Sequence, residues 1–468
     1  MDASRQPSNF DKFAQHVRLA YKEYLTVPTI IIAAFLVLAV AMIVLEHSGI
    51  PSVDRLREGI EKIALGNATS TQTTLAAAAG SLISITAITF TVLLLAVQQA
   101  AGAMSPMITD QFLRRPFNQV AFGFFVGISL YSLIVLAVAH STPHATFDPV
   151  LSALLAFAFS GIALYLLAAL VYVTLTQMRP SLVVHAIHDA TLQARKRQLP
   201  IIERTRRAPQ ISGGAHVAVR SRADGYVANV DLKGIERAMG KGRADLEIVL
   251  RVQVGSYVAL HDEVAEIRAV SDIDAEDLSR VILRALKLSK ERDLQYDAEH
   301  GILQIMNIGW TSISTSKQNP VPGAEAINAL RGLLSQWTGQ ENEPPDREKL
   351  PVVYHDDVPS KPLYMLESLG VAATESRQHQ NFALVLRTFA TMFDRLSPTQ
   401  RSQVEDMIPR LLSRLRDEVL TTELEESLLS LADALGAAGR RESAEVVREA
   451  HQRARKTVPS LADDSSSS

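Results

Sequence analysis

The sequence AAAAGSLISITAITFTVLLLAVQQ, residues 76–99, runs for 24 positions without a charged side chain. A helix of this length extends about 36 Å, which exceeds the roughly 30 Å hydrocarbon core of a bilayer. Three more long apolar runs are present, at residues 27–45, 120–139 and 150–176. Because soluble folds do not need apolar segments of this length, the sequence predicts a membrane protein with a bundle of four spanning α-helices.

Small and polar side chains recur along one face of the helix predicted at residues 76–99: Ala77, Gly80, Ser84, Ala87, Thr91 and Gln98. In a membrane, small residues and hydroxyls let two helices approach closely, so one interpretation is a helix contact that includes Gly80. The alternative is a pore in an oligomer, in which Ser84, Thr91 and Gln98 face water. Both interpretations turn this face away from lipid.

The third span carries a second packing signal. Gly123 and Gly127 have the GxxxG spacing that favours close contact between membrane helices. None of the four apolar runs contains Asp, Glu, Lys or Arg. Ion-coupled transporters usually keep ionisable groups at that depth, so this composition counts against a coupled transporter but not against a channel.

The segments between the spans predict the orientation of the chain in the membrane. Lys and Arg occur in the N-terminal segment 1–26, in the loop 100–119 and after residue 176, whereas residues 140–149 contain neither. The first external loop, residues 46–75, contains three basic residues and is an exception to the expected excess of Lys and Arg in cytoplasmic segments. The other segments agree, and both termini are therefore predicted to be cytoplasmic.

The stretch SLISITAITFTVLLLAVQQAAGAMSPMITDQFLRRPFNQVAFGFFVGISLYSLIVL resembles the signature of DUF2254, a family of predicted bacterial membrane proteins that is named as a domain of unknown function. The family pattern joins a Phe-Ser/Thr step, a Ser-Pro motif and an Asn-Gln pair, found here as Phe90-Thr91, Ser105-Pro106 and Asn118-Gln119. Met107 replaces the Arg expected after the Ser-Pro motif. The resemblance covers residues 24–340 and implies a multi-pass protein of the bacterial inner membrane, without naming an activity.

Basic side chains cluster in the juxtamembrane segment 177–214 that follows the last span: Arg195, Lys196, Arg197, Arg204, Arg206 and Arg207. Such a cluster attracts anionic lipid headgroups, which we favour over binding of a phosphorylated ligand. The spacing within this segment also predicts a helix over residues 182–199. His185 and His188 lie three positions apart on that helix, but they lack the further ligands that a metal site needs.

Alternating apolar residues and turn-forming glycines predict a β module at residues 215–270. Its pattern is similar to the barrel-sandwich of biotinyl and lipoyl domains, and it predicts a small barrel-like fold. The intervening LKGIERAMGKGRA is typical of a short helix and loop, so the modified lysine of carrier domains has no counterpart. We therefore expect a binding or structural module without a covalent cofactor.

The remaining sequence predicts a helical region at 271–340, a linker at 341–379, a second helical region at 380–460 and a disordered tail at 461–468. Asp293, Asp297 and His300 fall on one face of a predicted helix, where either a metal or acid–base site or a capped helix start would fit, and we favour the cap. Asn319-Pro320 occupies a proline-broken loop where the family resemblance implies an Asn-Asp-Pro motif.

Composition narrows the function classes. The net charge of -3 gives no reason to expect a nucleic-acid partner, and the absence of cysteine excludes disulfides and thiolate metal sites. No phosphate-binding loop, zinc-protease motif or nucleophile elbow is present, so we expect neither an enzyme nor a cofactor.

The sequence thus predicts a four-span bundle followed by a cytosolic α+β region. Three functions remain open: a homo-oligomeric channel or pore with a cytosolic vestibule, a membrane-anchored scaffold or sensor without transport activity, and an enzyme at the membrane surface. The enzyme is disfavoured, because no reaction constellation is present.

Overall fold

A computed structural model describes most of the chain in two compact units, Met1–Arg179 and Pro180–Ser468. We call them the N-terminal and the C-terminal unit. The described residues are 25–48, 68–103, 116–140, 149–177, 180–240, 245–270, 275–315, 319–338, 349–413, 415 and 420–456.

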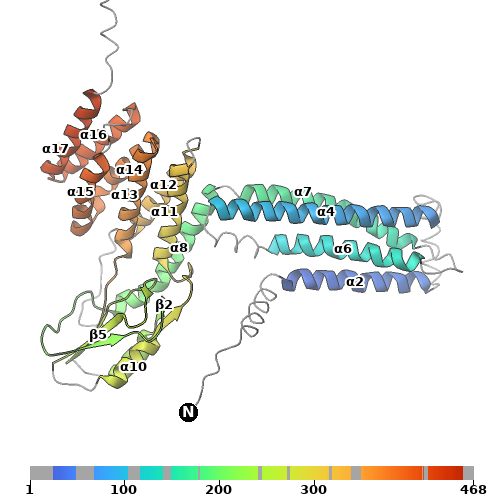
Figure 1. Cartoon of the computed structure of the whole chain (residues 1–468), viewed down its shortest axis with the longest axis horizontal. Coiled ribbons are helices and arrows are strands. Elements are labelled where there is room, and N and C mark those ends of the chain that lie inside the picture. The colour runs from blue at the N-terminus through green and yellow to red at the C-terminus, as the bar shows by residue number, and fades with distance from the viewer. Residues whose placement is uncertain are drawn as a thin grey trace, which may run out of the picture. The chain divides into compact units, whose positions relative to one another are not determined.

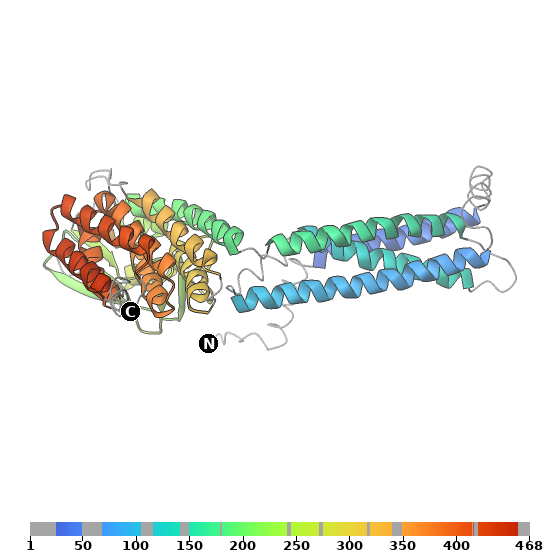
Figure 2. The same ribbon diagram turned by 90° about the horizontal axis from the view of Figure 1, so that it is seen from above.

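Four long helices make up the described part of the N-terminal unit, and Figures 1 and 2 show them side by side. They are α2 Thr26–His47, α4 Ala68–Ala103, α6 Pro116–His140 and α7 Val150–Gln177. Each contains an apolar segment long enough to cross a membrane, which confirms the four predicted spans as helices. With 36 residues, α4 is about 54 Å long and extends beyond a 30 Å hydrocarbon core.

Helix α6 packs against α2, α4 and α7 and forms the centre of this unit. Its glycines allow the approach of α2: a Cβ at Gly123 would lie 2.8 Å from Pro28 Cα, and one at Gly127 would lie 2.5 Å from Phe35 Cδ2. Next to this crossing, the rings of Phe35, Phe124 and Phe159 meet edge to face with centroids 5.4 to 6.0 Å apart. Small residues therefore set the helix spacing, and aromatic rings fill the space beside it.

A buried carboxylate joins α2 to the first turn of α7. Glu46 accepts hydrogen bonds from Ser152 N at Oε1 and from Ser152 Oγ at Oε2, both at 3.0 Å. Tyr131 of α6 donates to the carbonyl of the same Ser152 at 3.3 Å. The first amides of a helix have no partner within the helix, and a negative charge there is favoured, so Glu46 acts as a cap supplied by another helix.

The described strands of the C-terminal unit form two small open sheets. The first has the strand order β1-β5-β3-β7 and the second β4-β2-β6. The strands are β1 Ala215–Arg220, β2 Gly225–Val230, β3 Leu246–Leu250, β4 Tyr257–Val258, β5 Glu263–Ala269, β6 Leu286–Ser289 and β7 Val352–Tyr354. All neighbours pair antiparallel except β3 and β7, which are parallel.

The predicted barrel at residues 215–270 is therefore wrong, since no sheet among the described residues closes. The short helix expected in this stretch is present as α9 Leu232–Met239, and α10 Glu276–Ala285 follows β5. Both sheets take a strand from outside the predicted module: β6 lies within the region 271–340 predicted as helical, and β7 lies in the predicted linker. Valines and isoleucines of these strands form one core with the inner faces of α9 and α10.

The other long elements that the structure describes in the C-terminal unit are helices. They are α8 Pro180–Arg204, α11 Ala298–Thr315, α12 Val321–Trp337, α13 Lys361–Glu375, α14 His379–Met392, α15 Pro398–Leu412, α16 Thr422–Ala437 and α17 Arg441–Lys456. The helix expected at 182–199 lies within α8, whereas α13 replaces much of the predicted linker. Helices α8, α11 and α12 pack together, and α13 to α17 continue the layer as a stack (Figure 1).

Candidate functional site

The small and polar face of α4 points away from its own bundle. Ser84, Thr91 and Gln98 are all exposed on the N-terminal unit. A Cβ built at Gly80 would meet no atom of the described residues within 4 Å. The side chains of α4 that pack inside the unit lie on the opposite face: Leu75, Ala78, Leu82, Ile85 and Thr89. Among the described residues, no helix of the same chain therefore covers this face at Gly80, Ser84 or Thr91.

The hydroxyls of this face are bonded to their own helix. Ser84 Oγ donates to the carbonyl of Gly80 and Thr91 Oγ1 to that of Ala87, both at 3.0 Å. These bonds use the hydroxyl protons, so neither side chain needs water as an acceptor at membrane depth. Their oxygen lone pairs remain available to a cation or to a donor on another helix.

Gln98 differs from the two hydroxyl residues in depth. The apolar segment of α4 that is long enough to cross a membrane covers Gln72–Val92 and therefore includes Ser84 and Thr91. Gln98 lies six residues beyond its end, about 9 Å along the helix axis. Residues 93–97, LLLAV, continue the apolar run, so Gln98 lies at the C-terminal end of that run.

A groove between α4 and α7 continues the polar face. Hydroxyl and small side chains of α4 line it together with two residues of α7: Thr73, Thr74, Ala77, Ala78, Ser81, Phe157 and Ser160. Ala77 belongs to both the groove and the small face, so the two form one continuous surface.

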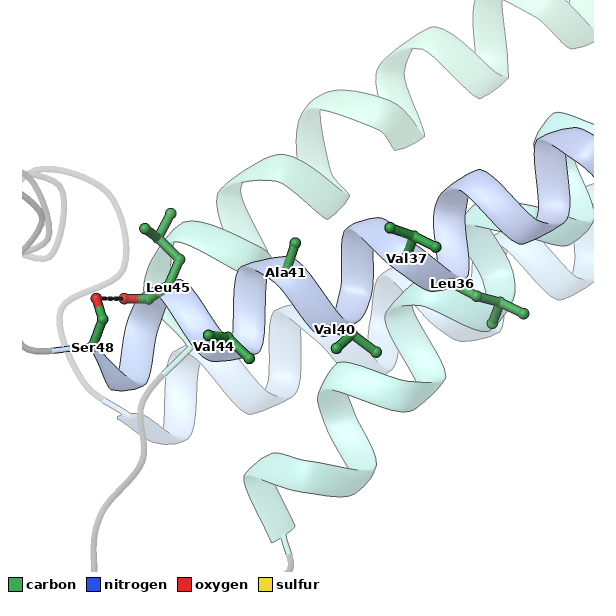
Figure 3. Close-up of a pocket in the computed structure, with 7 residues that line it drawn as sticks. All are labelled: Leu36, Val37, Val40, Ala41, Val44, Leu45 and Ser48. Atoms are coloured by element: carbon green, nitrogen blue, oxygen red, sulfur yellow. Dashed lines mark hydrogen bonds between the residues drawn. The ribbon is translucent and has the colours of Figure 1, made fainter.

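The outer face of α2 has the opposite chemistry. Figure 3 shows its shallow pocket, which is lined by Leu36, Val37, Val40, Ala41, Val44, Leu45 and Ser48. The one hydroxyl, of Ser48, donates to the carbonyl of Leu45 at 2.6 Å. An apolar face with its hydroxyl satisfied is suited to lipid acyl chains, which makes α2 a reference for the polar face of α4.

Several members of the predicted basic cluster are engaged within the C-terminal unit. Arg195, which is 7% exposed, donates to both oxygens of Asp356, from Nη1 at 2.8 Å and from Nη2 at 2.5 Å. Arg206 pairs with the buried carboxylate of Glu247 at 3.2 Å. Acids of the same unit therefore hold both of these guanidinium groups.

The other four members of the cluster lie nearer to solvent. Arg197 donates to the carbonyl of Gln295 at 2.7 Å, and Arg204 pairs with Glu236 at 2.7 Å. Lys196 and Arg207 are exposed. The cluster is therefore dispersed over several contacts, and binding of anionic headgroups remains a prediction for its exposed members.

The three residues considered for a metal or acid–base site make the bonds of a turn and a capped helix start. Asp297 precedes α11, accepts from His300 N at 3.0 Å and pairs with Arg292 at 2.6 Å. Burial lowers the pKa of His300 from its usual value. Asp293 accepts from Gln295 N at 2.8 Å. The geometry matches the capping interpretation, and the described residues contain no cluster of three or more metal-ligating side chains.

The histidines of α8 also have ordinary partners. His185 Nε2 lies 3.7 Å from Glu325 of α12, and His188 Nδ1 lies 3.3 Å from its neighbour Asp189. Each has one carboxylate beside it rather than the set of ligands that a metal site requires.

Sequence reasoning did not predict the polar contacts that join distant segments. Examples are Glu46 with Ser152 and Arg195 with Asp356, which lie 106 and 161 positions apart. Arg195 also lies over the ring of Trp337, 5.8 Å from its centroid. Only Glu46 had a signal, because it is a lone carboxylate directly after an apolar run.

Four helices of spanning length and composition define the class, a multi-pass membrane protein. The comparison with protein families then places it: the model of DUF2254, described as a predicted membrane protein, matches residues 22–377, and the chain belongs to this family. No curated protein and no solved structure matches the chain. The matched region includes all four spans, both sheets and α13, while α14 to α17 follow it.

Proposed function

We propose that the protein is a homo-oligomeric channel of the bacterial inner membrane in which the polar face of α4 meets the neighbouring subunits. The observation that carries the proposal is the outward direction of Ser84 and Thr91 at membrane depth. Membrane helices associate through small residues that allow close packing, and this face contains such residues with no described helix of its own chain packed on them. A second copy would supply one.

Conduction requires groups that replace part of the water around an ion. The hydroxyl oxygens of Ser84 and Thr91 keep lone pairs after bonding to their own helix. The two residues lie about two helical turns apart along the same face. In this proposal both termini are cytoplasmic, the C-terminal unit forms the vestibule, and no catalytic step takes place. The distribution of Lys and Arg in the sequence supports that orientation.

The alternative is a membrane-anchored scaffold or sensor. The observation in its favour is the stack of α14 to α17, which lies beyond the region matched by the family model and offers additional surface for a protein partner. In that case, the α4 face would serve assembly alone.

Ion flux into liposomes that contain the full-length protein tests the channel. Thr91→Leu should reduce the flux by about tenfold or more, because it removes the hydroxyl and fills the path. Thr86→Ala is the matched control, since Thr86 makes the same bond to its helix, at 2.8 Å to Leu82, but lies on the side of α4 that is half-buried in the bundle. Flux no greater than that of empty liposomes for the wild type would refute the channel and favour the scaffold.

A further inference from the structure

Three large apolar side chains are exposed at one end of the helix layer in the C-terminal unit. Leu182 of α8 is 49% exposed, Trp310 of α11 is 50% exposed, and Val321 of α12 is 57% exposed. Each comes from a different helix, so their exposure is not a feature of one amphipathic face.

Contacts between the helices place these residues at the same level. His185 of α8 lies beside Glu325 of α12, so the starts of these two helices are neighbours. A Cβ at Gly309 would lie 2.7 Å from Ala326 Cβ, so the last turns of α11 are beside the first turns of α12. Trp310 directly follows Gly309. The three side chains therefore share the end of the layer at which α8 begins.

The loop before α12 is held so that it presents Val321. The side chain of Asn319 accepts from Val321 N at 3.2 Å, and the carbonyl of Asn319 accepts from Ser312 Oγ at 3.4 Å. The amide of Asn381 donates to the carbonyl of Pro320 at 3.3 Å. These bonds give Asn319-Pro320 a structural role at this end, and Val321 directly beside them is exposed.

The covalent chain holds this end close to the bilayer. Helix α8 begins at Pro180, three residues after α7 ends at Gln177. Three peptide units span at most about 11 Å, whatever their conformation. The apolar segment of α7 ends at Thr174, less than one turn before Gln177. The start of α8 is thus tied to the zone of the lipid headgroups.

We propose that Leu182, Trp310 and Val321 form a membrane-contact tip that enters the interfacial zone of the bilayer. Indole is the side chain most suited to this zone, because its ring is apolar and its N–H can reach headgroup oxygens. Leu and Val beside it gain from leaving water for the boundary of the acyl chains. The tip lies about 20 Å along α8 from Arg195, so it is separate from the basic cluster.

The two tryptophans of the chain allow a direct test. Trp310 lies in the tip, whereas Trp337 is 8% exposed at the other end of α12 and lies beside Arg195. The full-length protein is reconstituted in liposomes whose lipids are brominated near the glycerol backbone, once as Trp337→Phe and once as Trp310→Phe. Bromine quenches indole only on contact, so each variant reports on one tryptophan.

The tip predicts that brominated lipid lowers the fluorescence of Trp310 by about twofold or more relative to that of Trp337. Quenching of Trp310 by aqueous iodide but not by brominated lipid would overturn the proposal, because the end would then face water. Protection from both quenchers would also overturn it, since a second protein surface would cover the tip. If Trp337→Phe does not fold, subtracting the fluorescence of Trp310→Phe from that of the wild type gives the signal of Trp310.

Discussion

Two glycine-containing helix faces in the N-terminal unit differ in what lies beside them. Gly123 of α6 lies against the backbone of α2, and a Cβ there would be 2.8 Å from Pro28 Cα. Gly80 of α4 has open space beside it among the described residues. The same kind of sequence pattern therefore marks a contact within the chain in α6 and a free surface in α4. A small-residue face that is exposed on its own bundle is suited to contact a helix of another molecule.

The largest effect is expected at the internal glycine. Gly123→Val places two methyl groups against backbone atoms of α2 that cannot move independently, and overpacking of this kind destabilises a fold by about 3 kcal/mol. Thermal unfolding in detergent should show a clearly lower Tm than for the wild type. An unchanged Tm would mean that α2 and α6 are not in close contact and would remove one side of the comparison.

The next effect is expected at the cap that joins α2 to α7. Glu46→Ala leaves the amide and the hydroxyl of Ser152 without their acceptor, which should destabilise the N-terminal unit by about 2 kcal/mol. Ser152→Ala removes only the hydroxyl and should have a smaller effect, about 1 kcal/mol. If both variants had the same Tm as the wild type, the carboxylate would not contribute to the stability of the bundle.

An acid-sensitive contact in the C-terminal unit provides a smaller effect. The hydrogen bond from Arg268, followed by bonds from His216 and Arg251, lowers the pKa of Glu266 from 4.5 to about 2, although burial opposes this shift. Because the folded pKa is below the unfolded one, this stability is present above pH 4.5 and is lost as the pH falls towards 2.

Glu266→Gln should therefore lower the stability of the protein at neutral pH by about 1 kcal/mol. Chemical unfolding of wild type and variant at several pH values measures this. The two curves should converge as the pH is lowered through this range, whereas a constant difference down to the acid end would contradict the assigned contact.

The smallest effect on folding is expected at the outward glycine. Gly80→Leu meets no described atom in its own chain and should change the unfolding free energy by less than about 0.5 kcal/mol. It should nevertheless reduce self-association, measured by the mass of the detergent-solubilised protein. Gly161→Leu on α7 is the control, since Gly161 has equally open space among the described residues. If Gly161→Leu disrupts association to the same extent, the α4 face has no special role.

Hydropathy alone predicted the four spans, because an uninterrupted apolar run of bilayer length has few other structural solutions. The periodicity of α4 likewise predicted a distinct small and polar face. It could not predict the direction of that face, since a helix has the same period whether its small side meets its own bundle or another molecule. Both α6 and α4 carry glycine among apolar residues, and only the neighbouring atoms in the fold separate Gly123 from Gly80.

Contacts between distant segments were also beyond the sequence. Strand β7 has three residues and pairs with β3, about a hundred positions earlier, so its local pattern resembles a linker. Strand β6 continues directly from α10 and was therefore predicted as helix. The basic cluster was predicted from its charge alone. In the structure Arg195 forms an ion pair with Asp356, which lies in that same predicted linker.

Cross-linking of single cysteines tests the central claim most directly, because the natural chain contains no cysteine. Thr91→Cys places a thiol on the polar face of α4, and Val37→Cys places one on the apolar outer face of α2 (Figure 3). Mild oxidation in membranes should give disulfide-linked dimers for Thr91→Cys and few for Val37→Cys. Equal cross-linking of both variants, or none for Thr91→Cys while the protein is folded, would contradict a subunit contact through α4.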